Sequence, residues 1–108
     1  MMTHPRIGQV AVIFISEGTG ADGDGYGAAA EQMAALVAEQ PGFMGVDWVG
    51  GEDGREITIS YWADDASAAA WRAHPEHEKI RDQGRGTWLK SYDLMVGTVH
   101  RGHQWERG

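Results

Sequence analysis

The distribution of hydrophobic and polar residues predicts four β-strands and two helical stretches. Apolar runs, some alternating with polar residues, predict strands at residues 9–16, 43–49, 55–62 and 90–100. A glycine-rich loop is expected at residues 17–27, and apolar residues at three- and four-residue steps predict a helix over residues 27–40. A second helical stretch begins at Asp64 or Asp65, reaches about His74 and resumes at Pro75. The order of elements is therefore β-α-β-β-α-β.

This order is that of the ferredoxin-like split βαββαβ arrangement, an α+β fold with a four-stranded antiparallel sheet and both helices on one face. In the strand at residues 55–62, Ile57, Ile59 and Tyr61 point to one face and alternate with residues that include Trp62. We place the Ile57 row on the face without helices, where a single copy would expose it. Exposed apolar patches of this kind mark interfaces. We therefore expect a homodimer in which two sheets close face to face, a dimeric α+β barrel.

Composition narrows the classes of protein. A length of 108 residues suits one domain spanning residues 1–108. Sixteen acidic against nine basic residues give a net charge of −7, which disfavours binding to nucleic acid or to anionic membranes. The absence of cysteine excludes disulfides, iron–sulfur clusters and thiolate zinc sites. With no long apolar run and no signal pattern at the start of the sequence, we expect a cytoplasmic protein without a metal site.

The residues with the most chemical capacity follow the strand at residues 55–62. Trp62 ends that strand, and Trp71, His74 and His77 lie on the helical stretch that folds back over it. We expect Trp62 to form the flat wall of a pocket between sheet and helices, with His74 or His77 at its rim as an acid or base. The alternatives are structural. Trp71 would be a core residue, His74 a residue at the C-terminal end of a helix, and His77 an exposed residue on a polar helix.

Two motifs resemble those of the antibiotic biosynthesis monooxygenase family of dimeric α+β barrels. One is a helix followed by QPGFMGVDWV at residues 40–49, and the other is YWADDASAAAWRAHPEH at residues 61–77. The resemblance extends from residue 9 to about residue 100 and implies the same ferredoxin-like fold. The family includes cofactor-free oxygenases of aromatic polyketides, haem-degrading enzymes, quinol oxygenases and small stress-responsive barrels. The fold alone does not choose among these activities.

The resemblance implies an oxidoreductase, a small monooxygenase that adds oxygen to a flat aromatic or quinol-like molecule without a metal or flavin cofactor. The catalytic base would be His74 or His77. The substrate would lie against a set of mostly aromatic and apolar side chains, namely Trp62, Trp71, Ser16, Phe14 and Met33. Two alternatives stay open: a monooxygenase that binds or degrades haem, and a non-catalytic stress-responsive barrel that binds a small ligand.

The resemblance also bears on haem. Haem-degrading members ligate the iron through a His on the second helix, and an ungapped comparison places Arg81 at that position, with His77 one turn earlier. The Asn that those enzymes carry on the first strand has no counterpart in the segment Phe14-Ile15-Ser16. Because a guanidinium stays protonated and cannot ligate iron, the expected haem affinity is low.

Overall fold

The computed structural model describes residues 2–19, 26–51 and 53–108, so most of the loop predicted at residues 17–27 lies outside the described residues. The order of elements is β1 (Met2–Thr3), β2 (Val10–Gly18), α1 (Tyr26–Ala38), β3 (Phe43–Gly50), β4 (Arg55–Trp62), α2 (Asp65–Arg72), α3 (Pro75–Gln83), a π-helical turn η1 (Gly84–Trp88), β5 (Leu89–Thr98) and β6 (His103–Gln104). In the part of the chain described, no helix combines the length and apolar character needed to cross a membrane.

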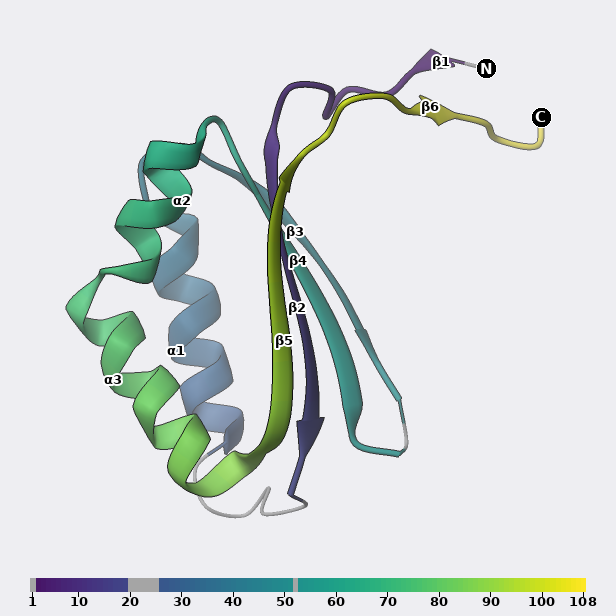
Figure 1. Ribbon diagram of the computed structural model, residues 1–108. Helices are drawn as coiled ribbons and strands as arrows, with labels where there is room; N and C mark the ends of the chain where they lie inside the picture. Colours follow the sequence, from purple (N-terminus) through teal and green to yellow (C-terminus); the bar gives the residue numbers. More distant parts are fainter. Residues whose placement is uncertain (1, 20–25, 52) are drawn as a thin grey trace.

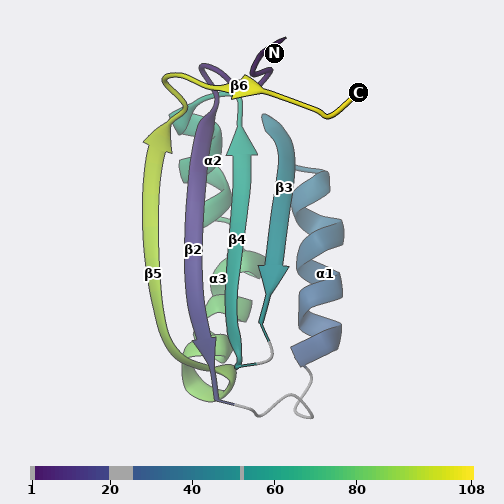
Figure 2. The same ribbon diagram turned by 90° about the vertical axis from the view of Figure 1, so that its right-hand side faces the viewer.

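Four strands form one antiparallel sheet in the order β3-β4-β2-β5. All the helices in the described residues cover the same face of this sheet (Figure 1), and none of them lies on the opposite face (Figure 2). The predicted α+β ferredoxin-like fold is therefore confirmed. The short ribbon of β1 and β6 was not predicted, because strands of two polar or weakly apolar residues show no periodicity.

The register of the central strand β2 fixes which side chains share a face. Val10 lies opposite Trp62, which places both on the helix-facing side. Ile13 lies between Ile59 of β4 and Met95 of β5 on the other side, which we call the open face. The predicted parity of the strand at residues 55–62 is therefore confirmed.

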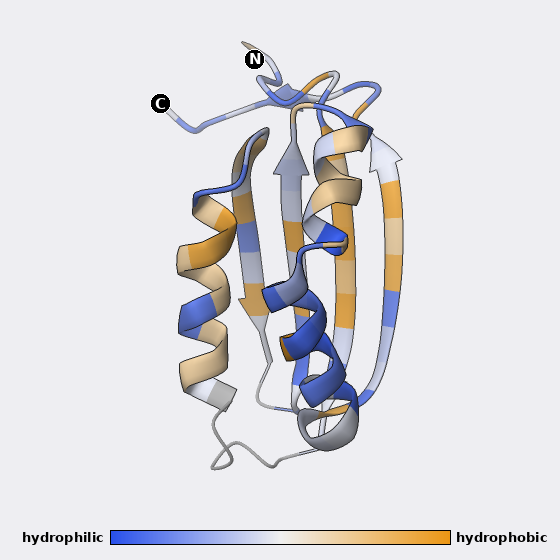
Figure 3. Ribbon diagram, turned by 90° about the vertical axis from the view of Figure 1, so that its left-hand side faces the viewer, coloured by the Kyte–Doolittle hydropathy of each residue, from blue (hydrophilic) through white to orange (hydrophobic). Residues whose placement is uncertain are grey.

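The core lies between the sheet and the helices. Four residues form its buried centre, namely Val10, Trp62, Ala68 and Trp71, and partly buried side chains from α1 and the strands pack around them. The residues in this surrounding layer are Val12, Met33, Leu36, Val37 and Phe43. Figure 3 shows that β2 carries hydrophobic bands beneath the helices, while α3 is largely hydrophilic. The core is therefore small, as expected for a short chain in which one sheet face is left open.

The second helical stretch is two separate helices. Asp64 begins α2 as its N-cap, accepting the Ser67 backbone N–H at 2.8 Å, and this hydrogen bond lowers the pKa of the Asp64 carboxyl. Pro75 cannot continue α2, since it has no backbone N–H, but it is suited to the first turn of α3. The predicted break near Pro75 is confirmed. Trp71 therefore lies on α2 and His77 on the separate helix α3.

Candidate functional site

The surroundings of His77, early in α3, fix its ring and favour its unprotonated form. Its ring lies on Trp71, with ring centres 4.3 Å apart and planes 16° from parallel. Its Nδ1 lies 3.0 Å from the Trp71 carbonyl oxygen, which can only accept, so Nδ1–H donates and Nε2 keeps its lone pair. Burial lowers the pKa of His77 from 6.5, and the Arg81 and Arg72 charges act in the same direction, against the opposing effect of the Trp71 carbonyl. The unprotonated imidazole is therefore the form present at neutral pH.

His74 has a structural role at the start of α3. It is the N-cap of α3, where its Nδ1 accepts the Glu76 backbone N–H at 3.2 Å. Its ring centre is 5.7 Å from that of Trp71, in a tilted arrangement. The alternative that placed His74 at the C-terminal end of a helix is wrong, because α2 ends at Arg72 and His74 begins the next helix. One of its two ring nitrogens, Nδ1, is therefore already used to cap α3.

Trp62 is a core residue in this structure. Its side chain has 0% exposure. Phe43 meets it edge-on at 5.6 Å, and Trp71 stacks on it at 6.3 Å. Its indole N–H donates to the Ser60 hydroxyl at 3.0 Å. The short link from β4 to α2 brings Ala68 and Trp71 directly over the ring, so the expectation of Trp62 as the wall of an open pocket does not match this packing.

The other predicted pocket residues lie on the same side of the sheet. Met33 packs against the core around Trp62 and so helps to fill this space. Ser16 is buried. Phe14 lies further along β2, with its ring centre 5.2 Å from that of Tyr92 on β5. The structure therefore divides the predicted set into a filled end around Trp62 and a second group around Phe14.

The group around Phe14 includes residues that sequence reasoning missed. The Arg85 Nε donates to the Tyr92 hydroxyl at 3.0 Å and so links η1 to β5. On the same helix-facing side of β5, Leu94 and Val96 keep 39% and 52% of their surface exposed. The period-two alternation of the last strand could have placed these three β5 residues together, because Tyr92, Leu94 and Val96 are two positions apart.

Arg81 does not fit the role of a haem ligand. Its guanidinium donates to the Arg72 carbonyl at 3.4 Å and lies 3.7 Å from the Glu78 carboxylate. A group that stays protonated has no lone pair for iron. Among the residues described, no three His, Asp or Glu side chains gather as a metal site would require.

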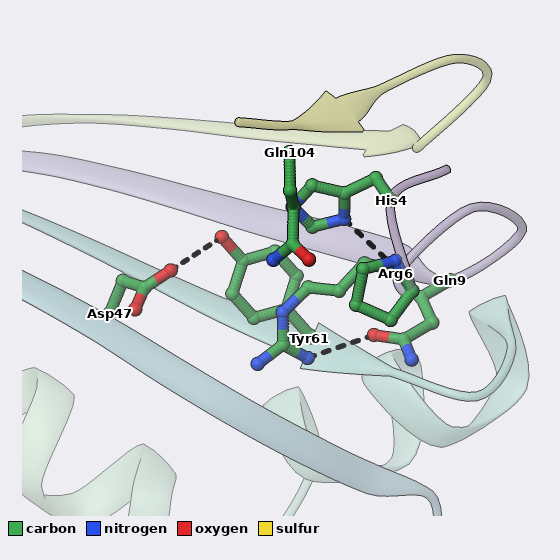
Figure 4. Close-up of a pocket in the computed structure, with 7 residues that line it drawn as sticks. His4, Arg6, Gln9, Asp47, Tyr61 and Gln104 are labelled. Atoms are coloured by element: carbon green, nitrogen blue, oxygen red, sulfur yellow. Dashed lines mark hydrogen bonds between the residues drawn. The ribbon is translucent and has the colours of Figure 1, made fainter. Parts of the chain in front are cut away.

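A cavity of about 400 Å³ lies on the open face, at the end of the sheet where the chain termini pass (Figure 4). It is lined by His4, Pro5, Arg6, Gln9, Asp47, Tyr61 and Gln104. The Tyr61 hydroxyl donates to Asp47 at 2.8 Å. Burial, followed by this bond and the Asp47 charge, raises the pKa of Tyr61, and the Arg6 charge partly offsets the rise. No local pattern along the chain points to this cavity, because its residues come from separate segments.

The sheet order and the helices on one face define an α+β protein of the ferredoxin-like class. Residues 7–83 match the model of the family described as antibiotic biosynthesis monooxygenase. The chain belongs to this family, as its motifs at residues 40–49 and 61–77 indicated.

Individual relatives agree with this assignment. The chain is 46% identical over 91 residues to the uncharacterized protein YqjZ of Bacillus subtilis, a match that covers 84% of this chain and 79% of that protein. Among solved structures it is similar to SnoaB, described as a cofactor-independent oxygenase from Streptomyces nogalater, with a TM-score of 0.74, 20% identity and coverage of 87% and 95% of the two chains. It is also similar to Rv0793 from Mycobacterium tuberculosis, with a TM-score of 0.72, 15% identity and coverage of 83% and 93%. At these identities the two structures show a shared fold.

Proposed function

We propose that the protein is a small monooxygenase that adds one oxygen atom to a flat aromatic or quinol-like molecule without a metal or flavin cofactor. The observation that carries the proposal is the state of His77. Its Nδ1 is committed to the Trp71 carbonyl, and its Nε2 keeps an unprotonated lone pair at neutral pH. A fixed, neutral imidazole is the group that this chemistry needs first, because a substrate can pass an electron to O₂ only after it has lost a proton.

With a quinol as substrate, the reaction balances without an external reductant. His77 Nε2 would remove a phenolic proton, and the resulting anion would give one electron to O₂. The substrate radical and superoxide then join through a new C–O bond. Loss of water, which breaks the O–O bond, leaves a hydroxyquinone. One quinol and one O₂ thus give one hydroxyquinone and one water, and the protein supplies the base and an apolar surface.

The apolar surface for the substrate would be the group around Phe14 rather than Trp62. Trp62 is closed off by Phe43 and Trp71, while Leu94 and Val96 next to Phe14 stay exposed on the helix-facing side. Flat organic ligands are held mainly by aromatic and apolar side chains with a few polar groups among them. The Tyr92 hydroxyl, held by Arg85, is such a polar group.

The two histidines provide a matched test by oxygen uptake. Wild-type protein given naphthohydroquinone in the presence of a chelator should consume O₂ above the rate in buffer. His77→Gln removes the base and should lower kcat by about 10²–10⁴-fold, the usual range for loss of an acid–base group. His74→Asn keeps an N-cap side chain and should leave kcat near wild type. Absence of uptake above the buffer rate, or equal rates for wild type and His77→Gln, would contradict the proposal.

One observation favours a second candidate, a non-catalytic barrel that binds a small ligand. The space around Trp62 is filled by the protein itself, with Met33 and Trp71 among the filling side chains. Such a protein would quench or shift its tryptophan fluorescence on binding naphthoquinone but would show no oxygen uptake with the quinol. The two readouts therefore separate the candidates.

The protein would act as a homodimer. The open face carries rows of apolar side chains, namely Ile13, Ile15, Ile57, Ile59 and Met95, and no helix of the described part of the chain lies over them (Figure 2). A contiguous apolar surface of this kind is unusual for a monomer. A second copy with the same surface would cover it in a two-fold arrangement.

A further inference from the structure

The cavity on the open face is built mostly from parts of the chain beyond the family match. His4, Pro5, Arg6 and Gln104 lie outside residues 7–83, and they fold over the ends of β3 and β4. The cavity has about 400 Å³, within the range of small-molecule sites. It lies on the side of the sheet opposite the proposed oxygenase site, so it would have a separate ligand. It is at one end of the open face, next to the apolar rows proposed as the dimer interface, so this ligand would bind at the edge of that interface.

Arg6 is fixed at the centre of this cavity. Its guanidinium carbon stands 3.8 Å above the Tyr61 ring centre. Its Nη1 donates to Gln9 Oε1 at 3.0 Å and to the Met44 carbonyl at 3.1 Å, which uses both Nη1 protons. Gly45 makes room for it, because a Cβ there would come within 2.6 Å of Nη2. The side chain is therefore held in place before any ligand arrives.

The other edge of this guanidinium has no partner within the described part of a single chain. Among the residues described, no acceptor is bonded to Nε or Nη2 of Arg6 and no carboxylate forms an ion pair with it. The Nε–Nη2 edge presents two parallel N–H groups, the geometry that matches the two oxygens of a carboxylate. A fixed and unpaired guanidinium at the centre of a cavity points to an anionic ligand.

Neighbouring side chains add further donors. His4 Nδ1 accepts the Arg6 backbone N–H at 3.1 Å, so the proton of its neutral ring is on Nε2. Gln9 uses its oxygen for Arg6, which leaves its amide N–H groups as donors. The Gln104 amide reaches the same cavity from β6 (Figure 4). The residues lining the cavity therefore offer N–H donors besides those of Arg6.

Asp47 limits the charge of the ligand. Its carboxylate accepts the Tyr61 hydroxyl at the other end of the Tyr61 ring, and it would repel a second negative charge. We propose that the cavity binds a small organic molecule with a single carboxylate, which pairs with the Nε–Nη2 edge of Arg6. A phosphate could form the same bidentate pair with Arg6, but its higher negative charge would be repelled more strongly by Asp47.

The test is a titration of the ¹⁵N-labelled full chain with sodium benzoate, followed by NMR chemical shifts. Benzoate should cause saturable shifts around Arg6 and Tyr61, including the Arg6 Nε–H signal. Benzamide, which has the same shape without the charge, should cause none there. Arg6→Gln should weaken benzoate binding by about tenfold or more, as expected for loss of a charge-assisted bidentate pair. Arg101→Gln removes an exposed arginine that does not line the cavity and should bind like wild type.

Three results would overturn the proposal: shifts that do not saturate, equal binding by wild type and Arg6→Gln, or inorganic phosphate binding more tightly than benzoate. Should Arg6→Gln fail to fold, Arg6→Lys keeps the charge without the planar edge and should still bind more weakly than wild type. The readout is independent of oxygen uptake, so this proposal and the proposed activity can fail separately.

Discussion

Trp62 on the helix-facing side of the sheet has 0% exposure, whereas Ile57, on the same strand but on the open face, keeps 41%. Both positions follow from the same alternation along β4. The helix-facing side is covered from within the chain, because α2 follows β4 directly and lays Ala68 and Trp71 over Trp62. Over the open face, none of the elements within residues 2–19, 26–51 and 53–108 provides such a cover (Figure 2). The comparison shows that alternation along a strand predicts which apolar side chains share a face. Whether that face is buried within the same chain depends on the segments that connect the strands.

The largest effect on stability is expected on the helix-facing side of the sheet. Trp62→Ala removes a ring that touches Phe43 and Trp71, and it should lower the free energy of unfolding by about 3–5 kcal/mol. Trp48→Ala is the matched control, because Trp48 is also on the helix-facing side but is 62% exposed, and it should cost less than about 1 kcal/mol. Urea unfolding at one fixed protein concentration measures both. Similar losses of unfolding free energy for the two variants would contradict the contrast between a buried and an exposed tryptophan.

At the open face the expected effect is on assembly. Light scattering at micromolar concentration should give about twice the chain mass of 11.8 kDa. Ile57→Glu places a charge in the proposed interface and should give the mass of a single chain. Ala69→Glu adds the same charge on the exposed side of α2 and should leave the dimer intact. A wild-type protein with the mass of a single chain would show that a second copy does not cover the open face.

A smaller effect is expected on the pH dependence of stability, through His77 in α3. Since burial lowers the pKa of His77, the unfolded chain takes up a proton near pH 6.5, before the folded chain does. The contribution of His77 to stability is therefore fully present above pH 6.5 and is lost as the pH falls through the folded pKa. His77→Gln should reduce the slope of unfolding free energy against pH in this range. Equal slopes for wild type and variant would mean that the ring is not desolvated by Trp71.

The smallest change is expected with haemin. The helix-facing side around Trp62 is filled, and Arg81 offers no lone pair, so haemin should bind weakly and without a one-to-one end point in a Soret titration. His77→Ala should leave this titration unchanged. Tight binding that His77→Ala abolishes would show instead that the helix layer opens to admit a large flat ligand.

Local patterns predicted the fold well and the site only in part. The alternation of β4, the Asp64 cap and the break at Pro75 were each readable from neighbouring residues. The burial of Trp62 was not, because it depends on how closely α2 returns over the strand. The cavity around Arg6 was also beyond prediction. It joins both ends of the chain to the middle of the sequence, and no short-range period links Arg6 with Tyr61.

The pairing of β1 with β6 has a practical consequence. Met2 lies opposite Gln104 and Thr3 opposite His103, so the two ends of the chain leave the body side by side (Figure 1). A purification tag at either end would therefore project from the same place, next to the cavity that contains His4 and Gln104. Close ends also suit circular permutation. Joining them with a short linker and reopening the chain between β3 and β4, at Asp53 and Gly54, would convert this pair of ends into a closed loop.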